Sequence, residues 1–339
     1  MFYLGFNVNF MSLFLFKIKC VCVVRSVMMD PSPRVLVTGA TGLLGRAMCK
    51  EFEGSDWTII GTGNSRAKPR LLSCDLTDEA AVRRLLSDSK PHVIVHCAAE
   101  RRPDVVERHP EAAANLNVHA TALLASLAAA SGALFLYIST DYVFDGRNPP
   151  YGEDDAPNPL NVYGKSKLQG EREALRHCPG ALILRVPVLY GEVTSVTESA
   201  VTCLWLNVES EEISALDHTQ QKFPTDTRQV AAVCRRLCER ARQDSSVRGV
   251  FHFSGNEQMT KYQMGVAMAQ AFDLPSNHLI PLTEQPAAAS AHRPINSQLN
   301  CSRLQLLNLG IEPTTFSSSI VECLWPFTAD RRWRQTVFH

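Results

Sequence analysis

Short apolar runs alternate with amphipathic stretches through the first half of the chain. The runs "RVLV" at 34–37, "HVIVH" at 92–96 and "LFLYIST" at 134–140 are each typical of a buried strand. After the first run, Ala47, Met48 and Phe52 follow at helical spacing. The alternation predicts an α/β fold with a doubly wound parallel sheet.

A glycine-rich turn joins the first predicted strand to the first predicted helix. Gly39, Gly42 and Gly45 stand three residues apart in "TGATGLLG". Glycine lets the backbone turn tightly and approach a pyrophosphate, which then lies at the helix N-terminus. Because a strand precedes the turn and a helix follows it, the triplet indicates a dinucleotide-binding Rossmann domain.

The second predicted strand ends in "GTGNSRAKPR", where the adenosine ribose would lie. An NAD enzyme usually carries an acidic residue here, but this chain has Asn64, Ser65 and Arg66. A guanidinium suits a 2′-phosphate, so the segment favours NADP over NAD. Lys68 and Arg70 fit a solvated basic loop equally well.

Two further strand ends complete the predicted cofactor site. Asp75 and Leu76 follow the third strand, where a carboxylate typically accepts from the adenine amine and an apolar side chain packs on the ring. Cys97 and Ala98 end the next strand and are small enough to leave room for a cofactor. Arg101 could reach the phosphates or could be an ordinary surface arginine.

Residues suited to carbonyl chemistry follow at the next strand end. Ser139 and Thr140 are expected in the cleft, and Tyr163 and Lys167 lie one helical turn apart in "PLNVYGKSK". The threonine would hold a ketone, the tyrosine would transfer a proton, and the lysine would lower the pKa of the phenol. Alone, the Tyr–Lys spacing fits a buried tyrosine and a surface lysine better, but the other motifs reverse that preference.

Composition narrows the functional classes. Lysine plus arginine equals aspartate plus glutamate at 34 each, which does not favour a nucleic-acid partner. The 11 cysteines are scattered through apolar runs without paired metal-ligand spacing. We therefore expect reduced thiols in a cytoplasmic protein, and no metal site.

The first 29 residues form an atypical apolar segment. "MFYLGFNVNFMSLFLFKIKCVCVV" is interrupted by asparagines and lysines, and it lacks the clean apolar length of a membrane span. A secretory signal would need a better cleavage site. We expect a disordered alternative N-terminus or an extension ahead of Met28 or Met29, with no membrane association.

The motifs "TGATGLLG", "HCAAERRPD", "STDYVFDG" and "PLNVYGKSK" together resemble the extended short-chain dehydrogenase/reductases, close to dTDP-4-dehydrorhamnose reductase. The resemblance runs from about Arg34 to Leu324. It implies an N-terminal extension (1–29), an NADP-binding Rossmann domain (30–190), a smaller substrate-type lobe (191–316) and a C-terminal helix with a tail (317–339). The segments "QKFPTDTRQVAAVCRRL" and "GVFHFSGNEQMTKYQMGVAMAQAF" are expected to return to the sheet side, with a capping box at Thr260 and Gln263.

The resemblance also implies the site residues. Its reductase-like candidates are Thr140, Tyr163 and Lys167, none of them an established catalytic residue here. Its cofactor-binding candidates for NADP are Gly39, Thr41, Gly42, Leu43, Leu44, Gly45, Asn64, Ser65, Arg66, Asp75, Leu76, Cys97, Ala98, Arg101, Tyr163, Lys167 and Leu189.

Within that family, "HCAAERRPDVVE" and "LWPF…RRWRQTVFH" resemble a group of regulatory β subunits. These are subunits that bind NADP and attach to the catalytic α subunit of methionine adenosyltransferase. The resemblance implies a hetero-oligomer and a role in modulating S-adenosylmethionine synthesis rather than in catalysis.

The C-terminal segment supports a partner site on physical grounds. A helix with cap candidates at Ser317, Ser318 and Ser319 is predicted to stop before Pro326. The remaining residues are rich in tryptophan, phenylalanine and arginine, which are common in interface hot spots, although a frayed terminus explains the composition equally well. The resemblance favours partner binding, and the candidates are Leu324, Trp325, Phe327, Arg332, Trp333, Arg334, Val337 and Phe338.

Two functional classes follow. The first is a non-catalytic, NADP-binding regulatory subunit. The alternative is an NADPH-dependent reductase of a 4-keto nucleotide sugar. The segment 193–214 carries no cluster of arginine or lysine for a sugar-nucleotide diphosphate, and this modestly favours the regulatory subunit.

Overall fold

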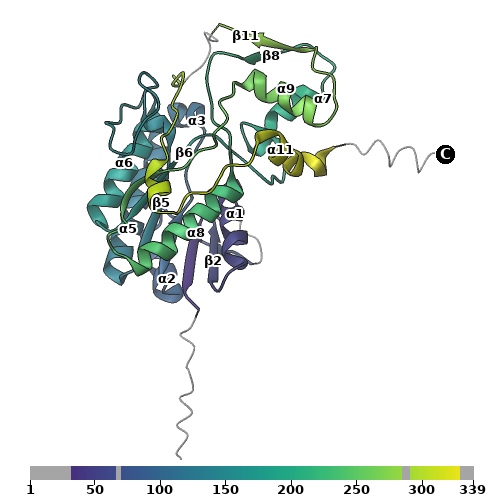
Figure 1. Ribbon diagram of the computed structural model, residues 1–339. Coiled ribbons are helices and arrows are strands. Elements are labelled where there is room, and N and C mark those ends of the chain that lie inside the picture. The colour runs from purple at the N-terminus through teal and green to yellow at the C-terminus, as the bar shows by residue number, and fades with distance from the viewer. Residues whose placement is uncertain (1–31, 66–69, 285–290, 329–339) are drawn as a thin grey trace, which may run out of the picture. The chain divides into compact units, whose positions relative to one another are not determined.

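In the part of the chain that the computed structural model describes, residues 32–65, 70–284 and 291–328, seven parallel strands form a central sheet (Figure 1). The strands lie in the order β10-β6-β5-β4-β1-β2-β3. Their bounds are β1 Arg34–Thr38, β2 Thr58–Gly63, β3 Leu72–Ser73, β4 Val93–His96, β5 Leu134–Thr140, β6 Leu182–Val186 and β10 Gly249–His252. The order reverses beside β1, so the predicted doubly wound sheet is confirmed.

Helices cover both faces of this sheet. On one face lie α1 (Leu43–Glu53) and α8 (Thr227–Gln243). On the other lie α2 (Glu79–Ser89), α5 (Ala120–Ser131) and α6 (Val162–His177). Each strand alternates its side chains between the two layers, and this alternation builds two cores from continuous apolar runs.

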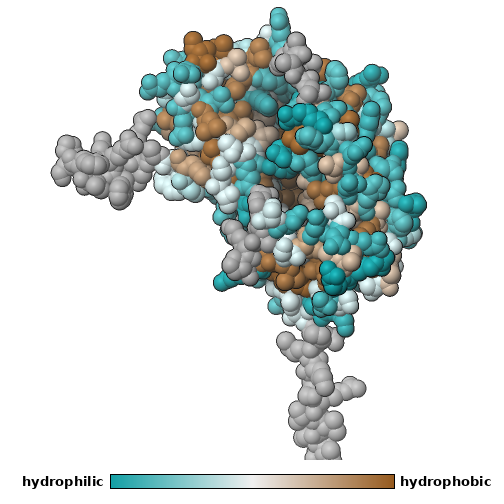
Figure 2. All heavy atoms as spheres, turned by 180° about the vertical axis from the view of Figure 1, so that it is seen from behind, coloured by the Kyte–Doolittle hydropathy of each residue, from teal (hydrophilic) through white to brown (hydrophobic). Residues whose placement is uncertain are grey.

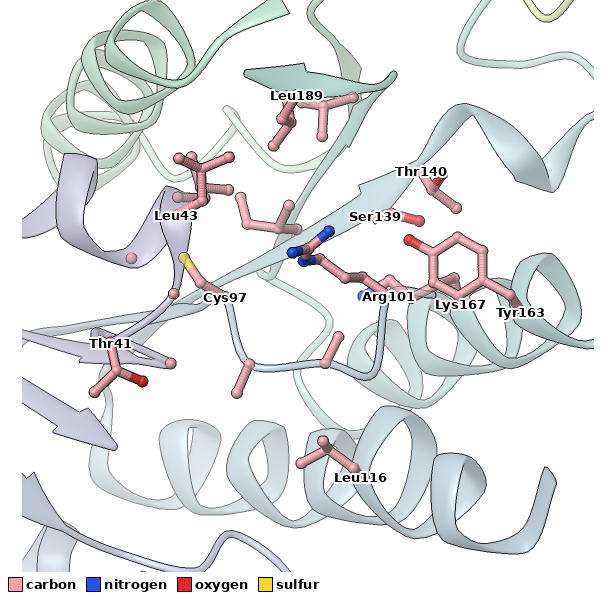
Figure 3. A pocket seen from close by; sticks show the side chains of 18 of the residues that line it. Thr41, Leu43, Cys97, Arg101, Leu116, Ser139, Thr140, Tyr163, Lys167 and Leu189 are labelled. Atoms are coloured by element: carbon pink, nitrogen blue, oxygen red, sulfur yellow. The ribbon is translucent and has the colours of Figure 1, made fainter. Parts of the chain in front are cut away.

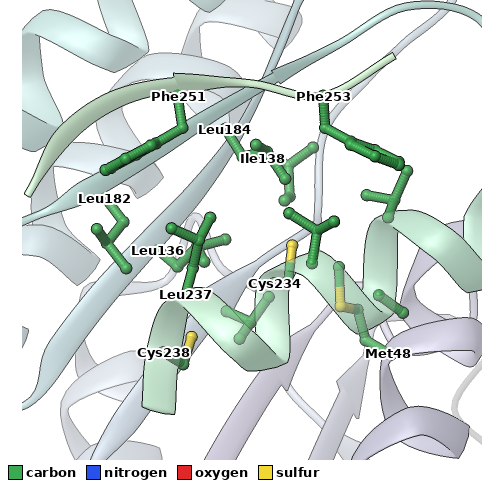
Figure 4. Packing of buried hydrophobic residues seen from close by; sticks show 14 of the residues in the cluster. Met48, Leu136, Ile138, Leu182, Leu184, Cys234, Leu237, Cys238, Phe251 and Phe253 are labelled. Carbon is green, nitrogen blue, oxygen red and sulfur yellow. The ribbon is translucent and has the colours of Figure 1, made fainter. Parts of the chain in front are cut away.

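Figure 4 shows the core between the sheet and α8. Cys234, Leu237 and Cys238 of α8 pack against Leu136 and Leu184 of the sheet. All five side chains are fully buried. The two thiols therefore act as small apolar groups here, as the sequence led us to expect.

A single helical stretch covers the β4–β5 side of the sheet. It runs through α4 (Pro110–Ala114), a π-helical turn (Asn115–His119) and α5. Among the described residues only this stretch is long and apolar enough to cross a membrane by length and composition. Its residues Leu124, Ala125 and Ala128 are fully buried against the sheet, which is the arrangement of a core helix.

A smaller lobe follows the sheet. It contains a parallel pair, β8 (Ser214–Asp217) and β11 (Leu279–Leu282), packed on α9 (Lys261–Ala271). Two more helices complete its core, α7 (Trp205–Glu209) and α11 (Phe316–Leu324). The remaining elements are α3 Pro103–Arg108, α10 Ser302–Leu306, the pair β7 Leu189–Tyr190 and β9 Thr225–Asp226, and the 3-10 turns Asp141–Val143, Val196–Glu198, Thr202–Leu204 and Trp325–Phe327.

The expectation for the returning segments is correct in part. Helix α8 and strand β10 do join the sheet. Helix α9, however, belongs to the small lobe, so placing it on the sheet side was wrong. Its buried Met264 and Met268 meet Trp205 in a third apolar cluster instead. The predicted capping box at Thr260 and Gln263 is confirmed.

Three expectations concern residues outside the described part. These are the N-terminal segment 1–29, Arg66 and the tail residues 329–339.

Candidate functional site

A cavity of about 440 Å³ lies at the carboxyl ends of the central strands, beside the point where the strand order reverses. Most of the residues predicted to bind the cofactor line this cavity. They are Gly39, Thr41, Gly42, Leu43, Leu44, Gly45, Asn64, Ser65, Asp75, Leu76, Cys97, Ala98, Arg101, Tyr163, Lys167 and Leu189. Arg66 lies outside the described residues. Segments far apart in the sequence thus form one concave site (Figure 3).

The glycine turn forms the wall where a pyrophosphate would lie. Gly39 has φ 67°, which favours glycine, and the Gly42 N–H donates to the Gly39 carbonyl at 2.9 Å. Gly42 is the N-cap of α1 and supplies no capping side chain. The first N–H groups of α1 therefore remain suited to an anion.

Close packing explains two of these glycines. A Cβ on Gly45 would lie 2.1 Å from the Gly39 oxygen, and one on Gly39 would lie 2.8 Å from the Ala98 nitrogen. The turn can therefore pack against α1 and against the loop after β4 only because Gly39 and Gly45 carry no side chain. A Cβ on Gly42 would lie 3.3 Å from the Gly39 oxygen, which is a tight contact but a less severe one than at Gly39 or Gly45.

The adenosine end is formed by the loops after β2 and β3. Asn64 and Ser65 are exposed and line the cavity, while Leu76 is buried. The Asp75 carboxylate accepts hydrogen bonds from the Thr77 N–H at 2.9 Å and from its hydroxyl at 2.7 Å. These bonds hold the pKa of Asp75 below its usual value, so the group is an anionic acceptor at neutral pH.

The carbonyl end is formed by β5 and the first turn of α6. Asn161 caps α6 by accepting from the Gly164 N–H at 2.8 Å, which places Tyr163 in the first turn. Tyr163 and Thr140 both line the cavity, and the Thr140 hydroxyl lowers the pKa of the Tyr163 phenol. A hydroxyl pair of this kind can hold and protonate a carbonyl oxygen.

In this structure the pKa of Tyr163 is raised above its usual value. Burial is the cause of this rise in pKa, and it outweighs the lowering by Thr140 and Arg101. Burial also lowers the pKa of Lys167 to about 7, against a smaller rise from Glu171.

A buried ionic network lies beneath Lys167. The Lys167 ammonium lies 4.0 Å from the centre of the Tyr137 ring. Glu171, one turn further along α6, accepts a hydrogen bond from Ser139 and two from Arg185, at 2.9 and 2.7 Å. Both partners of the ion pair are 3% exposed, so breaking either would leave a buried charge.

The sequence reasoning missed Glu171 and Arg185. Glu171 stands four residues after Lys167, and this spacing could have identified it. It also missed Asn117 in the π-helical turn, whose amide accepts from the Glu100 N–H at 2.9 Å and donates to the Ser166 hydroxyl at 3.1 Å. No local pattern marks Asn117, because its partners come from distant segments.

Arg101 lies in the cavity wall, and Figure 3 shows its guanidinium between Cys97 and Tyr163. It donates a hydrogen bond to the carbonyl of Glu198. Arg101 is exposed and also lines the cavity, so its position agrees with both a surface arginine and a phosphate contact.

The C-terminal helix differs from the prediction at its start. It begins at Phe316 with Thr315 as N-cap, because the Thr315 hydroxyl accepts from the Ser318 N–H, so the serine cap candidates were wrong. It ends at Leu324, and a 3-10 turn containing Pro326 follows, as expected.

The partner-binding candidates separate by exposure. Leu324 is fully buried in the small-lobe core and is not available to a partner. Trp325 is 66% exposed, and Phe327 packs at the edge of the same core. The other candidates, Arg332, Trp333, Arg334, Val337 and Phe338, lie outside the described residues.

Figure 2 shows separate brown, apolar patches among teal, polar surface on the rear face of the molecule. Exposed large apolar side chains on α7, on α11 or close to them include Leu206, Ile213 and Trp325. Of these three residues, Trp325 is the one that lies just before the C-terminal segment 329–339.

Comparisons with known proteins agree with this architecture. Residues 33–329 match the family described as the RmlD substrate binding domain. The chain is 66% identical to methionine adenosyltransferase 2 subunit beta of Danio rerio, over 91% of this chain and 95% of that protein. It is 57% identical to the Bos taurus protein of the same name, over 91% and 92%.

A solved structure has the same fold. It is dTDP-4-dehydrorhamnose reductase from Bacillus anthracis in complex with NADP, with a TM-score of 0.76 and 24% identity. The similarity covers 87% of this chain and 99% of the reductase.

Proposed function

We propose a function from the premise that this chain belongs to the RmlD substrate binding domain family and, within it, to the methionine adenosyltransferase 2 subunit beta proteins. In this proposal it is a regulatory subunit that binds NADP and attaches to the catalytic α subunit of methionine adenosyltransferase. Attachment modulates S-adenosylmethionine synthesis.

The cavity at the strand ends is the observation that carries NADP binding. It joins an open helix N-terminus for the pyrophosphate, small side chains at Cys97 and Ala98, and polar groups at both ends. The solved reductase of similar fold contains NADP. No acidic residue follows β2 at Asn64 and Ser65, which supports NADP rather than NAD.

The C-terminal segment supports partner binding. Trp325 is exposed beside Pro326 and leads into a stretch with three arginines, a tryptophan and a phenylalanine. Aromatic and arginine side chains contribute most to interface hot spots. The relatives are named as a subunit of methionine adenosyltransferase, and this identifies the proposed partner.

Removal of residues 329–339 tests the partner site. Association with purified catalytic subunit should weaken by at least about a hundredfold, because each lost hot spot contributes ~2 kcal/mol or more. NADPH binding should be unchanged, since the described residues that line the cavity are all retained in the truncated chain. Titrations of the parent and the truncated chain measure both quantities, and equal association would contradict the tail assignment.

The preference for NADPH over NADH is tested with the full-length parent protein. NADPH should bind more tightly than NADH, and Arg66→Ala should reduce that preference by about tenfold, the scale of a charge-assisted hydrogen bond. Equal affinity of the parent for both dinucleotides would refute the assignment.

A second candidate function is reduction of a 4-keto nucleotide sugar. Thr140, Tyr163 and Lys167 line the same cavity, and this arrangement favours it. NADPH oxidation on addition of a dTDP-4-keto-6-deoxy sugar, absent in Tyr163→Phe, would establish this activity.

A further inference from the structure

A loop of the small lobe, residues 193–199, lies against the phosphate end of the cavity. The residues on either side of it, Leu189 and Ala200, line the cavity. The Ser199 hydroxyl donates to the Leu189 carbonyl at 2.7 Å and ties the two ends of the loop together. The loop is thus anchored in the cavity wall at its base.

Glu198 joins this loop to the glycine turn. Its carboxylate accepts two hydrogen bonds from Arg46, at 2.7 and 2.8 Å, in the bidentate geometry of a strong ion pair. Arg46 also donates to the carbonyl of Thr41 at 2.9 Å, and Thr41 lines the cavity. The pair is shielded from solvent, with side chains 11% exposed for Glu198 and 27% for Arg46.

Glu198 also contacts the opposite wall. Its carbonyl accepts a hydrogen bond from Arg101 of the β4 loop. One residue therefore holds two arginines, one beside the glycine turn and one in the cavity wall. With two cations and a single carboxylate, the group retains a net positive charge that favours an anion.

We propose that Glu198 is a positioning residue of the dinucleotide site. It holds Arg46 beside the glycine turn and Arg101 in the cavity wall, and it fastens the 193–199 loop beside the phosphate end of the cavity. A dinucleotide then enters and leaves only when the Arg46–Glu198 pair opens. The inference rests on the proposed binding of NADP.

The rates of NADPH exchange test this role in the full chain. Glu198→Gln should raise both the association and the dissociation rate constant by about fivefold or more, because loop opening limits both. The dissociation constant should change much less, by under about threefold, since both rate constants rise together. Stopped-flow fluorescence of NADPH measures both rates.

Glu192→Gln is the matched control. Glu192 precedes the same loop, but its carboxylate pairs with Lys50 at the surface, where the two side chains are 75% and 72% exposed. This variant removes the same charge and should exchange NADPH like the parent. High salt should bring the dissociation rates of parent and Glu198→Gln closer together, because ions screen the pair.

Hydrogen exchange in the ligand-free protein provides a readout that is independent of NADPH. The Thr194 N–H donates to the Glu198 carboxylate at 3.0 Å. Amides of 193–199 should therefore exchange faster in Glu198→Gln than in the parent and in Glu192→Gln.

The outcomes separate the two proposals. If the parent binds NADPH and Glu198→Gln exchanges it at the parental rates, the positioning role is overturned alone. An equal acceleration in Glu192→Gln would also overturn it, because loop charge in general would then be responsible. If the parent binds no dinucleotide, the proposed function fails and this inference fails with it.

Discussion

Lys167 shows how burial controls a single charged group in this site. Its side chain is 4% exposed, it lies over the Tyr137 ring, and its pKa falls from 10.5 to about 7. Glu171 favours the protonated form of Lys167. It does not compensate for the lost hydration of the ammonium, because it is already paired with Arg185. In the ligand-free protein the charged lysine is therefore destabilising.

Lys167→Met should stabilise the ligand-free protein in a pH-dependent manner. Below pH 7 the lysine is protonated in both the folded and unfolded states, so the parent carries the full cost of the buried charge. Between pH 7 and 10.5 the folded lysine is neutral and only the unfolded chain binds the proton, so the cost falls as pH rises.

Denaturant unfolding of both proteins at pH 6 and pH 9.5 measures this difference. At pH 6 the variant should be more stable by a few kcal/mol, since one pKa unit corresponds to about 1.36 kcal/mol. The advantage should largely disappear at pH 9.5. An advantage of the same size at both values would show that Met packing, and not the charge, is responsible.

Helix α1 and the turn before it form the element on which the proposed cofactor site depends. The turn is built without side chains at Gly39, Gly42 and Gly45, but the three glycines do not have the same role. Gly45 permits contact between the helix and the turn, whereas Gly42 borders the open cavity at the helix N-terminus.

Alanine substitutions should separate these roles. Gly45→Ala places a Cβ 2.1 Å from a backbone oxygen, so the free energy of unfolding should fall by about 2 kcal/mol or more. Gly42→Ala meets one atom at 3.3 Å and should change stability little, while its methyl group obstructs the pyrophosphate. Thermal unfolding and NADPH titration of both variants provide the comparison. Unaltered NADPH affinity in Gly42→Ala would place the pyrophosphate elsewhere.

The two lobes of the described structure are joined near the C-terminal helix. Arg228, in the first turn of α8, donates to the buried Asp226 at 2.6 Å and also pairs with Glu322 of α11. Helix α8 packs on the sheet, and α11 leads into the C-terminal tail. This ion pair therefore links the helix that carries the tail to the Rossmann domain.

Glu322→Gln should loosen this link without unfolding the protein. Glu322 is 65% exposed, so the free energy of unfolding should change by less than about 1 kcal/mol. Hydrogen exchange of the α11 amides should become severalfold faster, and association with the catalytic subunit should weaken. Glu312→Gln, an exposed carboxylate ahead of α11, is the control. If α11 exchanges equally in both variants, the Arg228 contact does not hold it.

The central strands and the glycine turn could be predicted from local sequence patterns, whereas the full set of cofactor-site residues came from the family resemblance. A short apolar run rich in β-branched residues and bounded by a glycine turn favours a buried strand, and the glycines after it permit a backbone turn that other residues would obstruct. The chain therefore indicated β1, the glycine turn and the Tyr163–Lys167 helix before any coordinates.

Contacts between distant segments required the tertiary structure. The Glu171–Arg185 and Glu198–Arg46 ion pairs join residues that are 14 or more positions apart in the sequence. The burial that raises the pKa of Tyr163 depends on the packing of several elements around it. Likewise α9 has the same local signals wherever it packs, and only the apolar cluster of Met264 and Met268 with Trp205 placed it in the small lobe. Sequence patterns report which groups are present and which face is apolar, whereas the partners and the loss of water that determine their energies arise only when the elements pack.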